Sequence, residues 1–372
     1  MEFKNLRIYQ PDGTFHKGGL ALSGDRIAST PVSADACDMD GLYAIPGLID
    51  IHFHGCAGYD FCDGTEQAIS AIARYQAEHG VCAICPATMT YPEEKLTAVM
   101  QAAAAYRTER SGAALVGVNL EGPFLSPARK GAQNGAWLQN PDAGLFRRLQ
   151  EQAQGLIRLC EIAPELPGGL DVIGELAGEV RLSLAHTEAD YDTACEAFRR
   201  GAREVTHLFN AMPALHHREP GPIAAGAERN DVTAEIIADG VHIHPAMVRL
   251  AFALFGDDRM ILISDSLRAC GLGDGEYELG GQQFFVKGNR ATIANGSLAG
   301  SVSDVMACMR TAVRTMGIPL TSAVKAATVN PARALGLDGK LGAIAPGYQA
   351  DAVVLDRDLN IKHVVLRGKA IV

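Results

Sequence analysis

The chain of 372 residues lacks an excess of basic charge. Asp and Glu number 43 against 33 Lys and Arg, the formal net charge is -10 at pH 7, and no Lys/Arg cluster forms a stripe. Because nucleic-acid binding depends on clustered basic side chains, we expect no nucleic-acid partner. A negatively charged ligand would need a local basic pocket, since the overall field of the protein repels it.

Long hydrophobic runs are also missing. No segment approaches the roughly 18 apolar residues that a membrane-spanning helix requires. The first nine residues, MEFKNLRIY, alternate charge and apolarity and lack the apolar core of a signal peptide. We therefore expect no membrane association and a cytoplasmic location.

The cysteines lack the spacing of a disulfide framework. There are nine, an odd number, scattered over a large chain, which indicates reduced thiols in the cytosol. Cys82 and Cys85 form a CxxC pair, but they lie in an apolar run without a second pair. This context favours a buried strand over a zinc or redox site.

Apolar runs that alternate with helical periods begin at about residue 47. The candidate strands are residues 48–52, 81–88, 115–121, 157–163, 180–186, 204–208, 233–238 and 260–264. The clearest amphipathic stretches between them are residues 66–78, 93–110, 143–154, 188–200 and 245–255. Eight strand-helix units predict an α/β fold, a parallel (β/α)8 barrel of the TIM type, over residues 47–334.

The two ends of the chain contain short strands and glycine-rich turns without a helix. They predict one small β-sandwich domain built from residues 1–46 plus 335–372, with the barrel inserted between them. Helices at residues 302–316 and 322–328 would lead out of the barrel.

Ionisable side chains occur where the apolar strands end, which is where barrel enzymes place their chemistry. His52 and His54 share a face because side chains alternate along a strand. The other four follow strands three, five, six and eight: Glu121, His186, His207 and Asp265. A lone histidine at a strand end is more often structural, but six such residues on five strands predict a site for Zn²⁺, Fe²⁺ or Mn²⁺.

Such a site supports amide hydrolysis, because a bound cation acidifies water and polarises a carbonyl. Asp265 could take a proton from the attacking water and deliver it to the leaving amine. The alternative role for Asp265 is that of a plain metal ligand, and the two roles are compatible. A second HxH follows strand seven, and we favour His242 as a substrate contact and His244 as a structural or surface residue.

The motifs resemble those of the amidohydrolase superfamily and, within it, the N-acetylglucosamine-6-phosphate deacetylase family, over nearly the whole chain. The matching stretches are PGLIDIHFHG, NLEGPFLSPARKGAQN, LAHTEA, THLFNAM, HHREPG, IIADGVHIHP, ISDSLRACGLGDGEYELGG and NGSLAGS. The resemblance implies one or two divalent ions per subunit, zinc or iron first, with Glu121, His186 and His207 at a shared site. His52 and His54 match ligands of a second metal, and Asp265 matches the acid/base.

The resemblance also implies an amino-sugar phosphate substrate, N-acetylglucosamine 6-phosphate. The implied substrate contacts are Ala132, Gln133, Asn210, Ala211, His217, Arg218, His242, Leu298, Ala299 and Gly300. In relatives the arginine reaches the neighbouring subunit's substrate, so a homodimer with shared sites is implied. Some members have a histidine where this chain has Gln133, a neutral donor that could still bind substrate.

Other functions remain open at this point. A deacetylase of another N-acetylhexosamine 6-phosphate, such as the galactosamine type, is the nearest alternative. Many cyclic amidases use a modified lysine on strand four, which this chain lacks, and a purine deaminase would release ammonia instead of acetate. A non-catalytic sugar-phosphate sensor would lack a ligand or the acid/base, and all of these residues are present.

Overall fold

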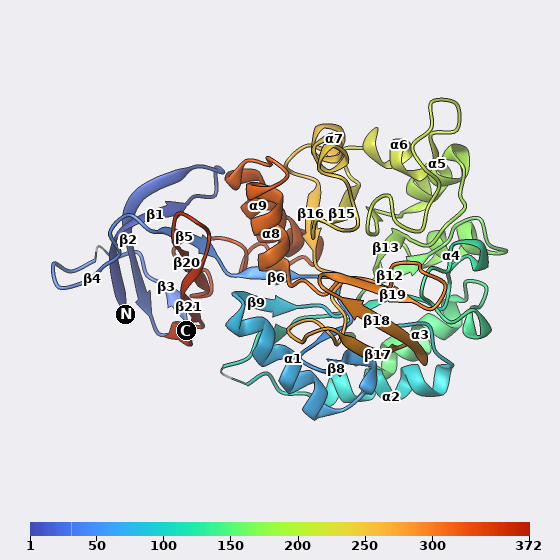
Figure 1. Ribbon diagram of the computed structural model, residues 1–372, viewed down its shortest axis with the longest axis horizontal. Coiled ribbons are helices and arrows are strands. Elements are labelled where there is room, and N and C mark those ends of the chain that lie inside the picture. The colour runs from blue at the N-terminus through green and yellow to red at the C-terminus, as the bar shows by residue number, and fades with distance from the viewer. Residues whose placement is uncertain (31, 110) are drawn as a thin grey trace.

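The computed structural model describes residues 1–30, 32–109 and 111–372. Parallel strands form a closed barrel in two hydrogen-bonded rows, β10-β9-β6 and β11-β12-β13-β14-β15-β16 (Figure 1). The strands are β6 (Leu48–Asp50), β9 (Val81–Ile84), β10 (Ala114–Leu115), β11 (Val118–Leu120), β12 (Ile157–Ile162), β13 (Arg181–Leu184), β14 (Glu204–Val205), β15 (Thr233–Ile237) and β16 (Met260–Ile263). A parallel bridge between Ala87 and Asn119 joins the rows on one side, and the Asp265 amide donates to the His52 carbonyl oxygen at 2.9 Å on the other.

The eight predicted strands lie at these positions, but most are shorter than expected. The third, residues 115–121, is divided into β10, which pairs with β9, and β11, which pairs with β12. The sixth, residues 204–208, ends at Val205. The early endings leave several of the candidate ligands on loops beyond the strands.

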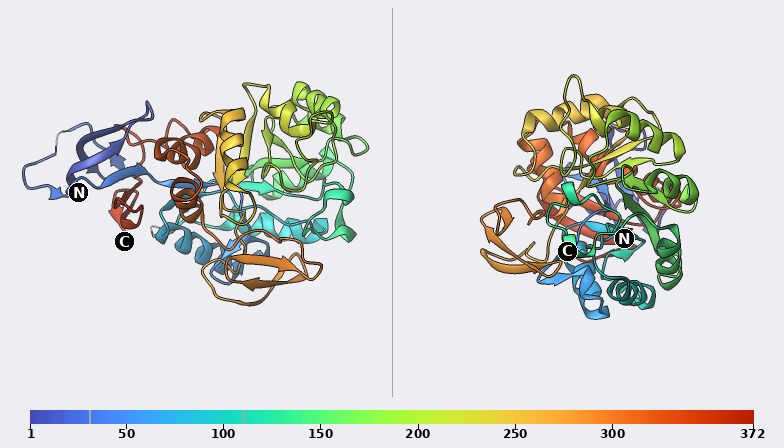
Figure 2. Two further views of the ribbon diagram at one scale, coloured as in Figure 1. Left: turned by 45° about the horizontal axis from the view of Figure 1, so that its top comes forward. Right: turned by 90° about the vertical axis from the view of Figure 1, so that its right-hand side faces the viewer.

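Helices cover the outside of the barrel and continue from it toward the sheet that contains both ends of the chain (Figures 1 and 2). They are α1 (Glu66–Glu78), α2 (Glu93–Ala105), α3 (Ala143–Gln152), α4 (Gly169–Leu176), α5 (Tyr191–Arg200), α6 (Gly221–Ala227), α7 (Pro245–Phe255), α8 (Val305–Arg314), α9 (Leu320–Ala327) and α10 (Val329–Ala334). The α5 helix begins later than the predicted residue 188 because the Asp190 side chain accepts from the Thr193 amide and so caps it. The predicted helix at 93–110 ends at Ala105, and its last residue, Arg110, lies outside the described residues.

Both ends of the chain contribute to one eight-stranded mixed sheet with its own hydrophobic core. Its strands are β1 (Glu2–Tyr9), β2 (Phe15–Ser23), β3 (Arg26–Ile27), β4 (Cys37–Asp38), β5 (Tyr43–Pro46), β20 (Ala352–Leu355), β21 (Ile361–Leu366) and β22 (Lys369–Ala370). The chain passes from β5 to β6 through Gly47, where an added Cβ would lie 2.6 Å from the Cys82 Cβ. Only glycine fits this close approach between the small sheet and the barrel.

An antiparallel sheet that the sequence analysis did not predict follows β16. It consists of β17 (Gly275–Leu279), β18 (Gln282–Lys287) and β19 (Arg290–Ile293), and a small hairpin, β7 (Gly55–Cys56) and β8 (Tyr59–Asp60), follows β6. The Gln282 side-chain amide donates to the carbonyl oxygen of Ala132 at 2.8 Å. This contact places the β17–β19 sheet against the loop that carries Ala132 and Gln133.

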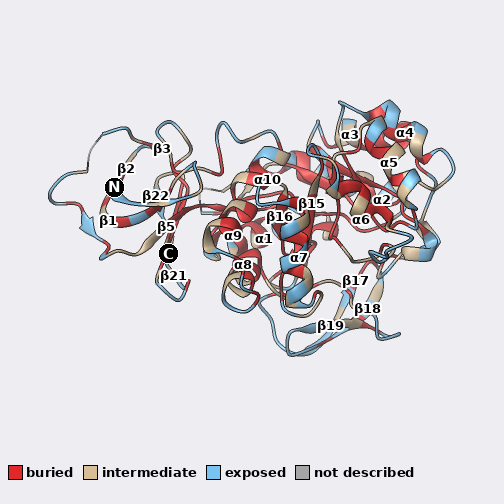
Figure 3. Ribbon diagram, turned by 90° about the horizontal axis from the view of Figure 1, so that it is seen from above, coloured by how far each residue is buried: buried red, intermediate tan, exposed pale blue. Residues whose placement is uncertain are grey.

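Burial is concentrated in the barrel strands and the inner faces of the helices (Figure 3). Cys82 and Cys85 lie in this interior, on and just after β9, and all nine cysteines are free. Burial raises the pKa of both thiols well above the usual range, so they are protonated packing residues. Among the described residues, no helix combines the length and apolarity needed to cross a bilayer.

Candidate metal centre

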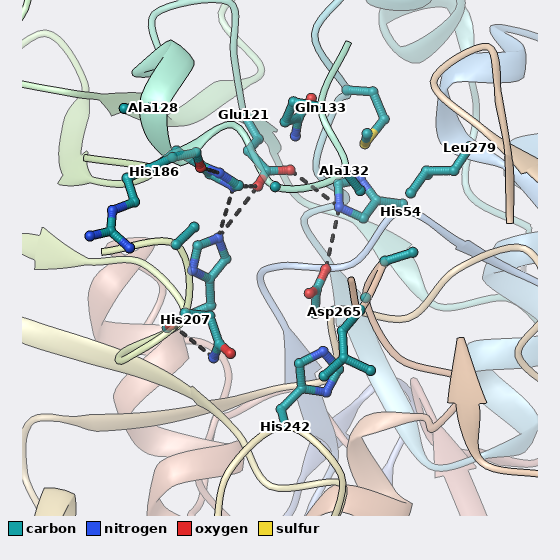
Figure 4. Close-up of a pocket in the computed structure, with 18 residues that line it drawn as sticks. His54, Glu121, Ala128, Ala132, Gln133, His186, His207, His242, Asp265 and Leu279 are labelled. Carbon is teal, nitrogen blue, oxygen red and sulfur yellow. Dashed lines mark hydrogen bonds and ion pairs between the residues drawn. The ribbon is translucent and has the colours of Figure 1, made fainter. Parts of the chain in front are cut away.

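Glu121, His186 and His207 converge at the carboxyl end of the barrel. They follow β11, β13 and β14 respectively. The Nε2 atom of His186 lies 3.0 Å from Glu121 Oε1 and 3.1 Å from His207 Nε2, and His207 Nε2 lies 3.6 Å from the same Glu121 oxygen. Figure 4 shows the three side chains pointing toward one another.

A hydrogen bond on the far side of the His186 ring determines which ring nitrogen carries the proton. Its Nδ1 atom lies 2.8 Å from the Arg129 carbonyl oxygen, which can only accept, so Nδ1 donates. A neutral His186 then directs its Nε2 lone pair at the Glu121 carboxylate and at the His207 ring. This lone pair and the Glu121 carboxylate repel each other unless positive charge lies between them. Imidazole nitrogens and carboxylate oxygens are ligands that fit Zn²⁺ or Fe²⁺.

His52 and His54 form the second part of the site. Because β6 ends at Asp50, both histidines lie in the following loop, yet both are buried. The His54 Nε2 atom lies 3.2 Å from Glu121 Oε2 and 3.3 Å from Asp265 Oδ1, while His52 Nε2 lies 3.9 Å from the same Asp265 oxygen. The ligand atoms of His52, His54 and Asp265 all lie within 4.8 Å of one another, as do those of His52, Glu121 and His207.

The backbone is strained at three of these six residues. His186, His207 and Asp265 have φ values of 43°, 28° and 47°, in the left-handed region that non-glycine residues rarely adopt. Hydrogen bonds hold the Asp265 position, because its amide donates to the His52 carbonyl oxygen and its carbonyl accepts from the Ser301 amide at 2.8 Å. Strain of this kind persists where the surrounding structure fixes it, and it is common at functional sites.

The carboxylates of the site are anionic. Burial alone would raise the pKa of Glu121, but its interactions with the neighbouring histidine rings, that of His54 first, lower it well below its usual value. Burial acts to raise the pKa of Asp265 as well, but the hydrogen bond with His54 outweighs it, and the pKa of Asp265 lies below its usual value. Negative charge at both groups at neutral pH favours a bound cation.

A cavity of about 290 Å³ opens above these side chains. Eight of the ten predicted substrate contacts line it: Ala132, Gln133, Asn210, Ala211, His242, Leu298, Ala299 and Gly300. His217 and Arg218 do not. Arg218 lines a neighbouring pocket of about 720 Å³, and His217 lies beside it, with the Arg218 Nη1 atom 2.8 Å from His217 Nε2.

The Gln133 side chain is held through its amide oxygen, and its amide nitrogen makes no hydrogen bond to the described part of the chain. Its Oε1 atom accepts from the Thr90 amide at 2.7 Å, and the side chain is buried against the cavity. The orientation leaves the Nε2 hydrogens as donors beside the cavity. The structure thus assigns an orientation to a residue whose role the sequence analysis left open.

Four residues near the site were not singled out from the sequence: Arg129, Glu161, Glu235 and Asp239. Arg129 lines both pockets and pairs with Glu188. Asp239 follows strand seven directly, so the strand-end rule used for the other ligands could have found it. Glu161 and Glu235 lie within strands, where one acidic residue in an apolar run gave no comparable signal.

Asp239 holds the segment of Val241 and His242 through three contacts. Its Oδ2 lies 2.8 Å from His242 Nδ1, and its Oδ1 accepts from the Val241 and His242 amides at 2.9 Å each. The other HxH residue, His244, caps α7 by accepting from the Ala246 amide through Nδ1.

The comparisons with known proteins cover nearly the whole chain. The amidohydrolase family matches residues 43–371. The N-acetylglucosamine-6-phosphate deacetylase of Bacillus subtilis (strain 168) is 36% identical over 98% of this chain and 95% of its own length. The N-acetylgalactosamine-6-phosphate deacetylase of Escherichia coli O157:H7 is 34% identical over 98% of this chain and 97% of its own length.

A solved structure shows the same architecture. A mutant N-acetyl-D-glucosamine-6-phosphate deacetylase from Mycobacterium smegmatis, in complex with N-acetyl-D-glucosamine-6-phosphate, has a TM-score of 0.93 and 35% sequence identity. The match covers 100% of this chain and 99% of that one. The chain belongs to the amidohydrolase family, which confirms the expected superfamily and the barrel fold.

The contact between Asp239 and His242 predicts a titration change. Burial lowers the pKa of His242, but the hydrogen bond and charge of Asp239 outweigh it and raise the pKa above the usual value. In Asp239→Asn the pKa of His242 should therefore fall, as measured by NMR titration of the histidine ring protons. Asp231→Asn, which removes a carboxylate paired with Arg229, should leave the His242 titration unchanged, and an unchanged titration in Asp239→Asn would contradict the pairing.

Proposed function

We propose that the protein hydrolyses the acetamide of N-acetylglucosamine 6-phosphate to give acetate and glucosamine 6-phosphate. One observation carries the proposal: side-chain atoms of Glu121, His186 and His207 that can bind a metal meet at one point, with Asp265 beside them in a cavity of about 290 Å³. The names of the relatives from Bacillus subtilis and Mycobacterium smegmatis support the choice of substrate.

The residues present suit one or two divalent ions, zinc or iron. Glu121, His186 and His207 would hold the first ion, and His52 with His54 would hold a second. When bound, such an ion lowers the pKa of water to roughly 7 and polarises the acetyl carbonyl.

Asp265 is the proposed general base and acid. As an anion it accepts a proton from the attacking water and later delivers that proton to the departing amine nitrogen. The contact between Asp265 Oδ1 and His54 Nε2, 3.3 Å apart, supports a fixed orientation for the carboxylate. Gln133 donates from Nε2 toward the acetamide oxygen. The contact of Gln133 Oε1 with the Thr90 amide supports this orientation of the side chain.

The remaining substrate contacts bind the sugar phosphate. Ala132, Asn210, Ala211 and the loop 298–300 surround the sugar, and His242 contributes positive charge. His217 and Arg218 bind the phosphate of the partner subunit's substrate in a homodimer. Their position outside the cavity of their own subunit supports this assignment.

The galactosamine epimer is the second candidate substrate. The relative from Escherichia coli O157:H7, an N-acetylgalactosamine-6-phosphate deacetylase, is 34% identical and specifically favours this alternative. One hydroxyl distinguishes the epimers, so substrate choice depends on the detailed shape of the cavity.

The proposed protein is cytoplasmic and has two domains. Nine free cysteines, most of them buried, support a reducing cytoplasm. The mixed sheet shared by the two termini supports a small domain of residues 1–46 plus 335–372 beside a catalytic barrel of residues 47–334.

A substrate panel tests the proposal. The metal-reconstituted protein should release acetate from N-acetylglucosamine 6-phosphate, with a much lower kcat/KM for the unphosphorylated sugar, because the phosphate contacts are lost. The panel includes the galactosamine and mannosamine 6-phosphate epimers and an ammonia assay. Equal kcat/KM values with and without phosphate, or release of ammonia instead of acetate, would contradict it.

Asp265→Asn tests the proton shuttle. The amide cannot accept a proton, so kcat should fall by about 10²–10⁴-fold while bound metal stays near the wild-type amount. Steady-state kinetics and elemental analysis of the same preparation measure both quantities. Retained turnover would refute the assigned role.

Subunit complementation tests the shared site. Arg218→Ala and Asp265→Asn homodimers should each be weakly active, but a mixed dimer regains one intact site, or about half of the wild-type activity. Differently tagged subunits, coexpressed and purified through both tags, provide the mixed species. A mixed dimer no more active than its parents would exclude an arginine supplied across the interface.

A further inference from the structure

One buried carboxylate beneath the candidate metal centre contacts two of the proposed ligands. Glu235 lies in β15 and is fully buried. Its Oε2 atom lies 3.0 Å from His52 Nδ1 and 3.2 Å from the His207 backbone nitrogen. Both nitrogen atoms can donate to this single oxygen.

The first contact orients the His52 ring. A carboxylate beside Nδ1 holds the proton there and leaves the Nε2 lone pair directed toward Glu121 and Asp265. His52 Nε2 has no hydrogen-bond partner among the described residues, which is expected of a ligand atom. Metal-binding histidines generally depend on a second hydrogen bond of this kind.

The second contact supports the strained backbone at His207. The ladder between β14 and β15 ends at Val205 and Ala234, and His207 has a φ of 28°. Glu235 continues the support through its side chain, which accepts from the His207 amide, and through its backbone carbonyl, which accepts from the Leu208 amide at 2.8 Å. The same residue therefore fixes the turn that presents the His207 ring.

Glu161 offers a comparison within the same interior. Its Oε1 atom lies 3.3 Å from His52 Nδ1, but it also accepts from the Asn119 side-chain amide at 2.9 Å. No hydrogen bond joins it to His207 among the described residues. The ligand atoms of His52, Glu161 and Glu235 lie close enough to hold an ion themselves, but a proton on Nδ1 makes the group a hydrogen-bonded support.

We propose that Glu235 is a positioning residue that couples the two halves of the metal centre, through the His52 ring on one side and the His207 backbone on the other. The inference rests on the proposed metal site. It assigns to Glu235 no contact with substrate or with the reacting atoms. Glu235 acts on the affinity of the site for metal.

A double-mutant cycle tests the coupling. Zn²⁺ is titrated into chelator-treated protein in competition with a chromophoric chelator, for wild type, Glu235→Ala, His52→Ala and the double variant. Glu235→Ala should weaken the tightest site by about 10–100-fold. Because the His207 contact remains when His52 is absent, Glu235→Ala should still weaken binding in the His52→Ala background.

Two further variants serve as controls for the role of the Glu235 side chain. Glu235→Gln retains an acceptor oxygen and should recover most of the affinity, while Glu161→Ala, which lacks the His207 contact, should have no effect in the His52→Ala background. Circular dichroism verifies that each variant is folded.

The possible failures are distinguishable. Wild-type protein that binds no Zn²⁺ would contradict the proposed metal site itself. Wild-type binding with unchanged affinity in Glu235→Ala, or no effect of that change in the His52→Ala background, would overturn the inference alone. A folded Glu235→Gln variant as weak as Glu235→Ala would also overturn it.

Discussion

The site depends on two buried acceptors, Glu121 Oε1 and His186 Nε2, that face each other 3.0 Å apart. The Arg129 carbonyl places the proton of His186 on Nδ1, so the Nε2 lone pair meets the carboxylate of Glu121 and the ring of His207. In a low-dielectric interior this arrangement is unfavourable unless positive charge lies at the meeting point. The same requirement makes these groups good metal ligands and gives the cavity its chemistry.

The fold supplies the rigidity that such an arrangement needs. Left-handed backbone at His186, His207 and Asp265 costs about 1–3 kcal/mol for each residue, a large fraction of the roughly 5–15 kcal/mol by which a domain is usually stable. Barrel closure offsets this cost, because the His52 carbonyl holds Asp265 and the strand interior around Glu235 holds His207. A ligand carried by a mobile loop would lack this support.

The sequence was sufficient to predict the barrel and the six ligand candidates, because strand ends in a parallel barrel meet at one rim. It was not sufficient to predict the supporting groups. Glu235 is one acidic residue inside an apolar strand, and its partners, His52 and His207, lie on loops distant in sequence. The sheet β17–β19 was missed because its short, exposed strands lack the apolar runs of the barrel. The position of Arg218 outside the cavity follows from no periodicity in the sequence, and only the family resemblance pointed to it.

The most direct test of the central claim is anomalous diffraction from crystals of the wild-type protein grown with Zn²⁺ and recorded on both sides of the zinc absorption edge. Zn²⁺ bound at the site should give a peak at about 2.0–2.2 Å from Glu121 Oε1, His186 Nε2 and His207 Nε2. A structure in which these three side chains point away from one another, or in which the anomalous signal lies elsewhere, would contradict the account.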